Sequence, residues 1–238
     1  MAVEEQRVLI IGGTSGIGLV TAREVVDRGG RVVIAGRKFE RAVEVADFLG
    51  DAAQGAEVNI SDPKSVIDLP RQTGDVDHVV LSAASLTYGR FLEIDLDAAR
   101  DVFETKFWGY FRVARVYATR LPQHGSFTFF SGVAADRPQS GSVAVTAVNA
   151  AVEGLTRSLA IELAPVRVNA VSPGVVDTSS WDRLSAEERA SMFDQVAASL
   201  PVRRIGRPTD VARAVVELID NGFTTGEVRH VDGGARIV

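Results

Sequence analysis

Short apolar runs alternate along this chain with longer segments in which apolar residues recur every three or four positions. The first run, residues 8–11, leads into a glycine-rich segment and then into a helical pattern over residues 17–27. Short apolar runs bounded by turn residues are typical of buried strands, so the alternation predicts strands joined by helices. Further strands are expected at residues 31–35, 56–58, 127–130, 166–171 and 228–231 and within 76–83. Further helices are expected at 38–49, from 61 onward, and at 97–120, 144–163 and 208–220.

This regular alternation predicts an α/β fold. We expect a Rossmann-like, doubly wound parallel sheet of about seven strands with helices on both faces, and ligands at the carboxyl ends of the strands. The length suits a single dinucleotide-binding domain over residues 1–238. Residues 179–204 interrupt the pattern, and Ser185 with Glu188 matches a capping box that begins a helix there. We expect this segment to form a lid.

The glycine-rich segment has the features of a phosphate-binding loop. It reads Gly12-Gly13-Thr14-Ser15-Gly16-Ile17-Gly18 between an expected strand and an expected helix. Glycines allow a tight turn and bring main-chain N–H groups close to a pyrophosphate, and the helix N-terminus favours negative charge. The segment therefore predicts a dinucleotide cradle, although a glycine-rich turn without a ligand is the alternative.

The end of the second expected strand indicates which nucleotide is bound. NAD-binding units carry an acidic residue about 20 positions after the glycines, where it contacts the ribose hydroxyls. Here the strand ends in Gly36-Arg37-Lys38, with two cations and no carboxylate. Arg37 is suited to bidentate binding of a 2′-phosphate, with Lys38 and Ser15 nearby. We therefore favour NADP(H) over NAD(H), against the alternative that Arg37 is an ordinary solvated residue.

Composition excludes several function classes. The chain contains no cysteine, so disulfides, thiolate catalysis and cysteine-bound metals are excluded. No apolar run approaches the roughly 18 residues of a membrane span, and with no signal-peptide pattern visible we expect a cytoplasmic protein. The net charge of −5 gives no basic surface for nucleic acid. His78, His124 and His230 lack metal-ligand spacing, so we expect no metal site and place these residues on the surface or in loops.

Over essentially its whole length, the chain resembles the short-chain dehydrogenase/reductase family. The glycine segment matches the family's cofactor loop, and residues 166–174 match the segment that ends the sixth strand beside the nicotinamide. Residues 204–212 and 225–234 match its C-terminal signature. Asn59 replaces an aspartate that contacts adenine, and residues 82–85 read Ser-Ala-Ala-Ser instead of Asn-Asn-Ala-Gly.

The resemblance implies a small-molecule substrate and a homodimer or homotetramer built partly on the helices at 97–120 and 144–163. It also implies a set of cofactor contacts. These are Gly12, Thr14, Ser15, Gly16, Ile17, Gly18, Arg37, Lys38, Asn59, Ile60, Ser82, Ala83, Ala84, Pro173, Gly174, Val176 and Thr178.

The catalytic positions depart from the family's pattern. The family uses a Tyr-x-x-x-Lys pair as general acid and ribose contact, a serine that holds the carbonyl, and an asparagine on the preceding helix. By the family spacing, these positions hold Val145, Asn149, Gly132 and Lys106 respectively. Neither tyrosine nor lysine occurs after residue 117, so no change of alignment restores the pair.

Two of these positions have exchanged their residue types. Lys106 lies on the earlier helix and Asn149 on the later one, so a lysine from the neighbouring helix would preserve a cation beside the ribose. The alternative is that Lys106 is an ordinary helix residue, because lysine is a good helix former. Tyr110 lies one turn further along, and we interpret it as a packing residue rather than an acid.

Three functions are consistent with this pattern. The first is a divergent NADPH-dependent reductase of a small apolar carbonyl, enone or imine compound, which takes its proton from Lys106, Ser131, Thr146 or water. The second is a catalytically inactive, nucleotide-binding regulatory or scaffolding subunit, and a lyase or isomerase is a less favoured third. The expected pocket is apolar. It would be lined by Leu86, Tyr88, Phe91, Trp181, Leu184, Met192, Phe193 and Leu200.

Overall fold

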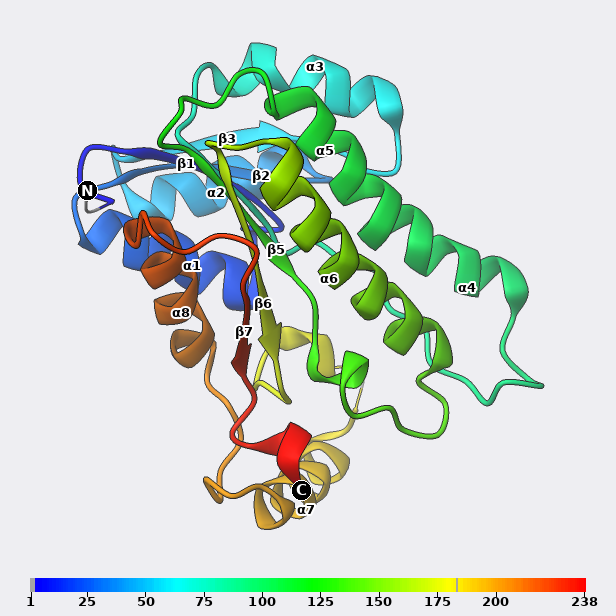
Figure 1. Cartoon of the computed structure of the whole chain (residues 1–238). Helices are drawn as coiled ribbons and strands as arrows, with labels where there is room; N and C mark the ends of the chain where they lie inside the picture. The colour runs from blue at the N-terminus through cyan, green and yellow to red at the C-terminus, as the bar shows by residue number, and fades with distance from the viewer. Residues whose placement is uncertain (1–2, 183) are drawn as a thin grey trace.

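A computed structural model describes residues 3–182 and 184–238 of the chain (Figure 1). Its strands form one parallel sheet in the order β3-β2-β1-β4-β5-β6-β7, which confirms the predicted fold class. The strands are β1 (Arg7–Ile11), β2 (Arg31–Gly36), β3 (Ala53–Glu57), β4 (His78–Leu81), β5 (Ser126–Phe130), β6 (Arg167–Pro173) and β7 (Val228–Val231). The order reverses between β1 and β4, and ligands of such sheets bind at the carboxyl side of this switch point.

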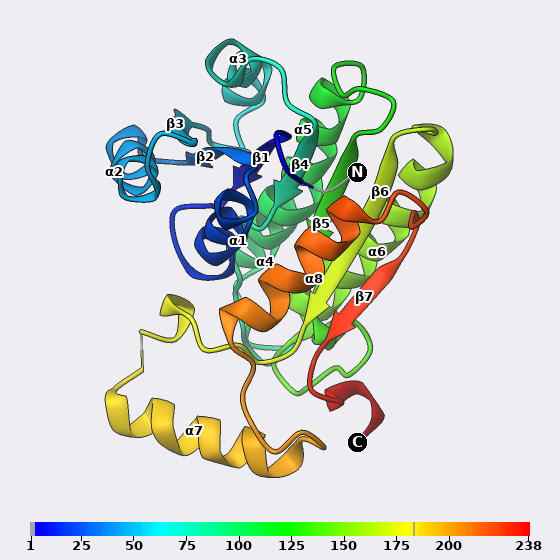
Figure 2. The same cartoon turned by 90° about the vertical axis from the view of Figure 1, so that its left-hand side faces the viewer.

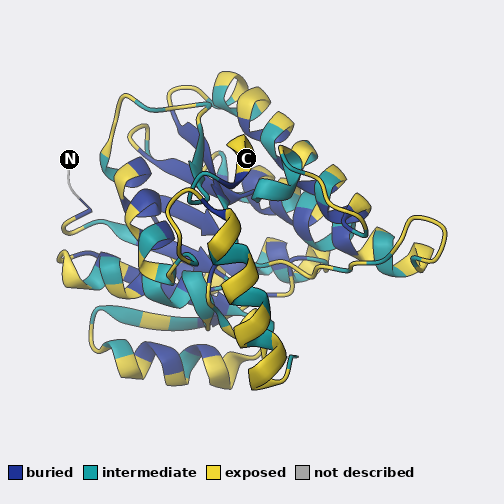
Figure 3. Cartoon of the chain, turned by 90° about the horizontal axis from the view of Figure 1, so that it is seen from below, coloured by how far each residue is buried: buried dark blue, intermediate teal, exposed yellow. Residues whose placement is uncertain are grey.

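Helices cover both faces of the sheet (Figures 1 and 2). They are α1 (Gly16–Asp27), α2 (Phe39–Leu49), α3 (Pro63–Thr73), α4 (Leu96–Phe103), α5 (Gly109–Tyr117), α6 (Val143–Glu162), α7 (Ala186–Ser199) and α8 (Pro208–Asp220). One hydrophobic core joins the sheet to α3, α5 and α6, and the other joins it to α1, α2 and α8. The inner strands are therefore buried on both sides, which explains why β1, β2, β4 and β5 are almost continuously apolar in sequence (Figure 3).

The helix expected at residues 97–120 is interrupted, which corrects the prediction of a continuous helix. It consists of α4, a π-helical turn (Glu104–Trp108) and α5. A single π-turn inside an α-helix inserts an extra residue into the hydrogen-bond ladder and is frequent at functional sites. Lys106 lies in this turn, and the turn directs it into the protein, where it is 4% exposed.

Two further expectations require correction. Strand β3 spans Ala53–Glu57 and begins three residues before the predicted range, because the polar Gln54 and Gly55 obscure it as an edge strand. His78 lies buried in β4 rather than on the surface, with its ring nitrogens hydrogen-bonded to Ser126 and Gln6. Burial lowers the pKa of His78 to about 3, so the ring is neutral.

The segment expected to be a lid contains one helix at its centre. Ser185 and Glu188 form the predicted capping box at the start of α7, and none of the helix's residues is buried. Figure 2 shows α7 beyond the carboxyl ends of β6 and β7, separate from the helices that cover the sheet. Residue 183 of this segment, like the first two residues of the chain, lies outside the described residues. Among the described residues, no helix has both the length and the apolar character needed to cross a membrane.

Candidate functional site

Two glycines of the loop after β1, Gly12 and Gly18, lie too close to neighbouring backbone to carry a side chain. Gly12 has a φ of +92°, and a Cβ atom there would lie 2.6 Å from the backbone nitrogen of Ala83. A Cβ on Gly18 would collide with the carbonyl oxygen of Gly12, so the first turn of α1 packs directly on the loop. This close backbone approach at a helix N-terminus is the geometry that receives a pyrophosphate.

Thr178, in the loop that follows β6, lies next to this cradle. Gly16 has a φ of +54°, and a Cβ there would lie 3.6 Å from the side chain of Thr178. Pro173 ends β6, a Cβ on Gly174 would lie 2.9 Å from the Cα of Asp232, and Val176 forms a parallel bridge with Gly206. The structure thus brings the glycine loop and Thr178 to the same edge of the sheet.

The predicted adenosine contacts lie at the ends of β2 and β3. Arg37, Lys38 and Asn59 are all exposed there, and a Cβ on Gly36 would lie 3.0 Å from the side chain of Thr14. The loop therefore abuts the end of β2, where exposed cations follow it. This arrangement fits a nucleotide with a phosphorylated ribose, because a guanidinium and an ammonium would meet the additional phosphate.

Four further predicted cofactor residues differ in their surroundings. Ser82, Ala83 and Ala84 follow β4 beside Gly12, and the Ser82 hydroxyl donates a 3.2 Å hydrogen bond to the carbonyl of Ile11. Ile60 instead is buried, since its side chain packs where a Cβ on Gly109 would lie, 2.9 Å away. Its side chain is therefore enclosed by α5 rather than presented to a ligand.

Lys106 and Asn149 meet in the interior at the carboxyl end of β5. The ammonium nitrogen Nζ of Lys106 donates to Asn149 Oδ1 at 2.6 Å and to the carbonyl oxygen of Ser131 at 2.9 Å. Asn149 Nδ2 in turn donates to the carbonyl oxygen of Gly132 at 3.3 Å. The π-turn and α6 thus place the two exchanged residues in direct contact.

The environment of Lys106 changes its acidity. Burial lowers its pKa from 10.5 to about 7, and the negative charge of Glu153 partly opposes this effect. The two hydrogen bonds of Nζ go to neutral carbonyl groups, which do not compensate a buried positive charge as a carboxylate in contact would. Near neutral pH the amine is therefore able both to give and to accept a proton.

The other two candidate catalytic positions have no ionisable side chain. Val145 is buried, and Gly132 faces the amide of Asn149. A Cβ on Gly132 would lie 2.9 Å from Asn149 Nδ2, so the amide occupies the space that a serine would need. Tyr110 is fully buried with its ring 5.6 Å from that of Phe129, in agreement with its interpretation as a packing residue.

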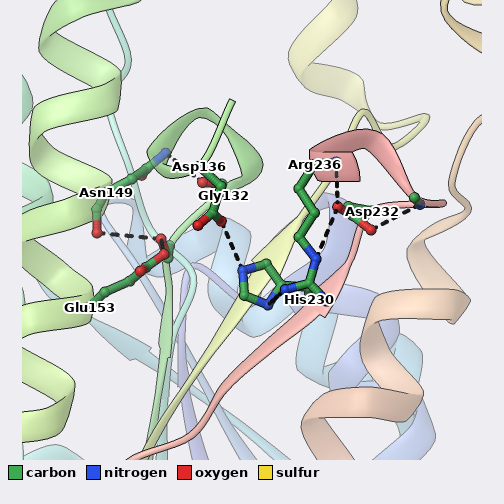
Figure 4. A network of polar contacts seen from close by, with 9 residues as sticks. Gly132, Asp136, Asn149, Glu153, His230, Asp232 and Arg236 are labelled. Atoms are coloured by element: carbon green, nitrogen blue, oxygen red, sulfur yellow. Dashed lines mark hydrogen bonds and ion pairs between the residues drawn. The ribbon is translucent and has the colours of Figure 1, made fainter. Parts of the chain in front are cut away.

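The sequence did not predict the polar network that lies beyond Asn149. It consists of Ser131, Asp136, Glu153, His230 and Arg236, and we refer to it as the outer network (Figure 4). The Ser131 hydroxyl donates to Glu153 at 2.7 Å, and His230 Nε2 lies 2.8 Å from Asp136. Ser131 and Asp136 follow β5, Glu153 lies on α6, His230 lies in β7, and Arg236 lies in the turn after β7. Only the one-turn spacing on α6 between Asn149 and Glu153 was visible in the sequence.

Two cavities lie near the site, and neither has the expected lining. The larger, about 530 Å³, lies between the loop after β4 and the start of α6, and of the predicted lining residues it includes only Phe91. It is lined by Arg90, Phe91, Leu92, Glu93, Pro138, Gln139, Ser140, Gly141, Ser142, Val143 and Thr146. The second, about 440 Å³, includes Leu184 and Phe193, together with the polar Asp177, Asp182 and Arg189. Neither cavity therefore combines the predicted residues of the β4 loop with those of the 179–204 segment.

Comparisons of sequence relate the chain to reductases. A family model described as enoyl-(acyl carrier protein) reductase matches residues 12–236. The short-chain dehydrogenase/reductase ATR9 of Stachybotrys chlorohalonatus is 31% identical over 98% of both chains. The 3-oxoacyl-(acyl-carrier-protein) reductase FabG of Escherichia coli is 29% identical, over the full length of both chains.

Solved structures share the fold over nearly the whole chain. A small-chain dehydrogenase in complex with NADPH is 33% identical, with a TM-score of 0.88 over 99% of this chain and 100% of that one. An NADPH-bound short-chain oxidoreductase from Pseudomonas aeruginosa, which contains an atypical catalytic centre, is 28% identical, with a TM-score of 0.89 over 97% and 96%. The MalC reductase/Diels-Alderase from Malbranchea aurantiaca is 29% identical, with a TM-score of 0.90 over 98% and 96%.

Proposed function

Because this chain belongs to the short-chain dehydrogenase/reductase family, we propose that it is a divergent NADP(H)-dependent reductase of a small apolar carbonyl, enone or imine compound. The observation that carries this proposal is Lys106. Its buried amine has a pKa of about 7 and lies against Asn149, where the family spacing expects a lysine. A group that titrates near neutrality is suited to general acid catalysis.

The cofactor assignment rests on residues of this chain and on two neighbours. Arg37 and Lys38 are exposed at the end of β2, beside the glycine loop. The two neighbours at 33% and 28% identity were solved with NADPH, which supports the same choice here. When bound, NADPH supplies a hydride, and the protein's part is to hold it, to orient the substrate and to provide the proton.

In this proposal the chain lacks the family's usual catalytic residues and Lys106 takes over the proton transfer. Gly132 and Val145 carry no proton, whereas Lys106 Nζ can release one to the oxygen of a carbonyl as the hydride arrives. An iminium substrate needs no such proton, because hydride addition to the cation gives a neutral amine directly. Iminium compounds are therefore the substrates least affected by the departures.

A second candidate function is a catalytically inactive nucleotide-binding subunit with a regulatory or scaffolding role. It is favoured by the hydrogen bonds of Asn149, which engage both Lys106 and the carbonyl of Gly132. Both ends of the Asn149 amide are therefore hydrogen-bonded within the protein without a substrate.

The assembly and location belong to the proposal as well. Trp108, Phe111 and Ile161 are exposed apolar residues on the π-turn, α5 and α6, the helices on which we expect a homodimer or homotetramer to form. We propose a cytoplasmic protein that acts on a small molecule and has neither a nucleic-acid nor a membrane partner.

The experiment that separates the two functions compares binding with turnover. NADPH affinity is measured by fluorescence, and NADPH consumption is measured with ketones, enones and cyclic imines. The same assays are run on the combined variant Gly132→Ser, Val145→Tyr and Asn149→Lys. The reductase predicts consumption by the wild type with at least one class. Tight binding without consumption by the wild type, together with consumption by the variant, would establish the inactive subunit instead.

A further inference from the structure

Glu153 lies next to Ser131 and Asn149, the two residues that accept hydrogen bonds from Lys106. Ser131 accepts a hydrogen bond from Lys106 through its carbonyl and donates one to Glu153 through its hydroxyl, at 2.9 Å and 2.7 Å. Glu153 is also one helical turn after Asn149, so both side chains leave α6 on the same side. A single residue, Ser131, therefore connects the carboxylate of Glu153 to the buried amine of Lys106.

On its other side, Glu153 reaches the protein surface through the outer network. Atoms of Glu153, Asp136 and His230 lie within 4.8 Å of one another, a separation that one bridging water spans. The side chain of Asp136 is 38% exposed, whereas that of His230 is 14% exposed. Glu153, Asp136 and His230 thus form a polar path toward solvent (Figure 4), and Ser131 joins this path to Lys106.

The hydrogen bonds of His230 argue against a metal ion at this cluster. The guanidinium of Arg236 lies 3.0 Å from His230 Nδ1, and because an arginine only donates, Nδ1 must accept. The ring proton is then on Nε2 and is donated to Asp136. A metal ion on Nε2 would move this proton to Nδ1, against the guanidinium. The cluster is therefore better suited to proton exchange than to metal binding.

We propose that Glu153 is a positioning residue that controls whether Lys106 carries a proton, and that Asp136 and His230 connect Glu153 to solvent. This inference rests on the proposed function of Lys106 as the acid. After a carbonyl takes a hydride from NADPH and a proton from Lys106, one proton from solvent returns to the amine by this path. The overall reaction consumes one carbonyl, one NADPH and one proton, and yields one alcohol and NADP⁺.

The other ionisable groups around Lys106 do not compete for this role. Glu104, in the same π-turn, is engaged in an ion pair with Arg112. Tyr110 on α5 is fully buried, and its pKa is raised far above neutrality by that burial. The acidic group on α6 that raises the pKa of Lys106 is Glu153. The charged groups next to Glu153 belong to the outer network.

The test is the titration of Lys106 in the Glu153→Gln variant, measured without substrate. Glutamine keeps an oxygen that accepts from Ser131 but removes the charge. The chain has only three lysines, and the other two, Lys38 and Lys64, are exposed, so ¹³C-lysine NMR resolves Lys106 as the group that titrates near neutrality. We expect the variant to lower its midpoint by roughly one pH unit.

A matched control is available on the same helix. Glu162 also accepts from a serine, Ser158, but is exposed near the end of α6, so Glu162→Gln should leave the midpoint unchanged. An unchanged midpoint in Glu153→Gln would overturn the inference. A lowered midpoint without turnover of any substrate would retain the link between Glu153 and Lys106 and refute the proposed reductase. In an active enzyme, the pH profile of kcat should move with the midpoint.

Discussion

Replacing Lys106 with methionine should change how the stability of the protein depends on pH. The wild-type amine is buried, with a pKa lowered from 10.5 to about 7 because burial disfavours its charged form. Methionine has a similar length and no charge. The substitution also removes the hydrogen bonds that Lys106 donates to Ser131 and Asn149.

The magnitude follows from proton linkage. Between about pH 7 and 10.5 the unfolded chain binds a proton at Lys106 that the folded chain does not, so wild-type stability rises with pH. The penalty for burying the charge is fully present below about pH 7 and is lost as the pH approaches 10.5. The slope is about 1.4 kcal/mol per pH unit, which gives roughly 2.7 kcal/mol between pH 6 and 9.

Urea unfolding of the wild type and Lys106→Met at pH 6 and pH 9 measures this effect. We expect the wild type to gain roughly 2.7 kcal/mol relative to the variant at the higher pH. The exposed Lys64 provides the control, because Lys64→Met should show the same difference from the wild type at both pH values. If the difference for Lys106→Met is also the same at both, Lys106 titrates normally and the argument for its acid role fails.

Three further substitutions test other parts of the account. Arg37→Ala should weaken NADPH binding by roughly tenfold or more and NADH binding much less, since a charge-assisted hydrogen bond is lost. Arg41→Ala, in the first turn of α2, should alter neither, and equal weakening of both nucleotides by Arg37→Ala contradicts the cofactor assignment. Gly132→Ser alone should lower the free energy of unfolding by roughly 1–3 kcal/mol, because its Cβ would lie 2.9 Å from Asn149 Nδ2. Asn149→Ala should relieve much of this cost in urea unfolding, and additive effects of the two substitutions would refute the steric coupling. As the pH falls from 6.5 toward 3, the wild type should lose about 1.4 kcal/mol of stability per pH unit because of the buried His78, and His78→Gln should not show this loss. If the two proteins lose stability in parallel as the pH falls, the buried ring is not the cause.

The fold was predictable from sequence because its signals are local. Each buried strand is an apolar run, and the capping box of Ser185 and Glu188 marks the start of α7. The edge strand β3 was placed too late because only one of its residues, Ala56, is buried. His78 was misplaced because its partners, Gln6 and Ser126, are distant in sequence.

The candidate site was predictable only in part, for a related reason. The exchange of Lys106 and Asn149 is visible in the sequence, but their contact depends on a π-turn inside an apparently continuous helix. The outer network joins positions as distant as Ser131 and His230. No spacing rule relates such residues, since they meet only where the carboxyl ends of the strands and α6 converge.

The most direct test of the central claim is the rate of NADPH-dependent ketone reduction by the wild type and Lys106→Met, followed across pH. We predict that wild-type kcat falls as the pH rises through about 7, because the acid must be protonated. Lys106→Met should reduce ketones roughly 10²–10⁴-fold more slowly than the wild type while it still binds NADPH. Its rate with a cyclic iminium substrate should fall much less. Ketone reduction at the wild-type rate by Lys106→Met would show that Lys106 is not the proton donor.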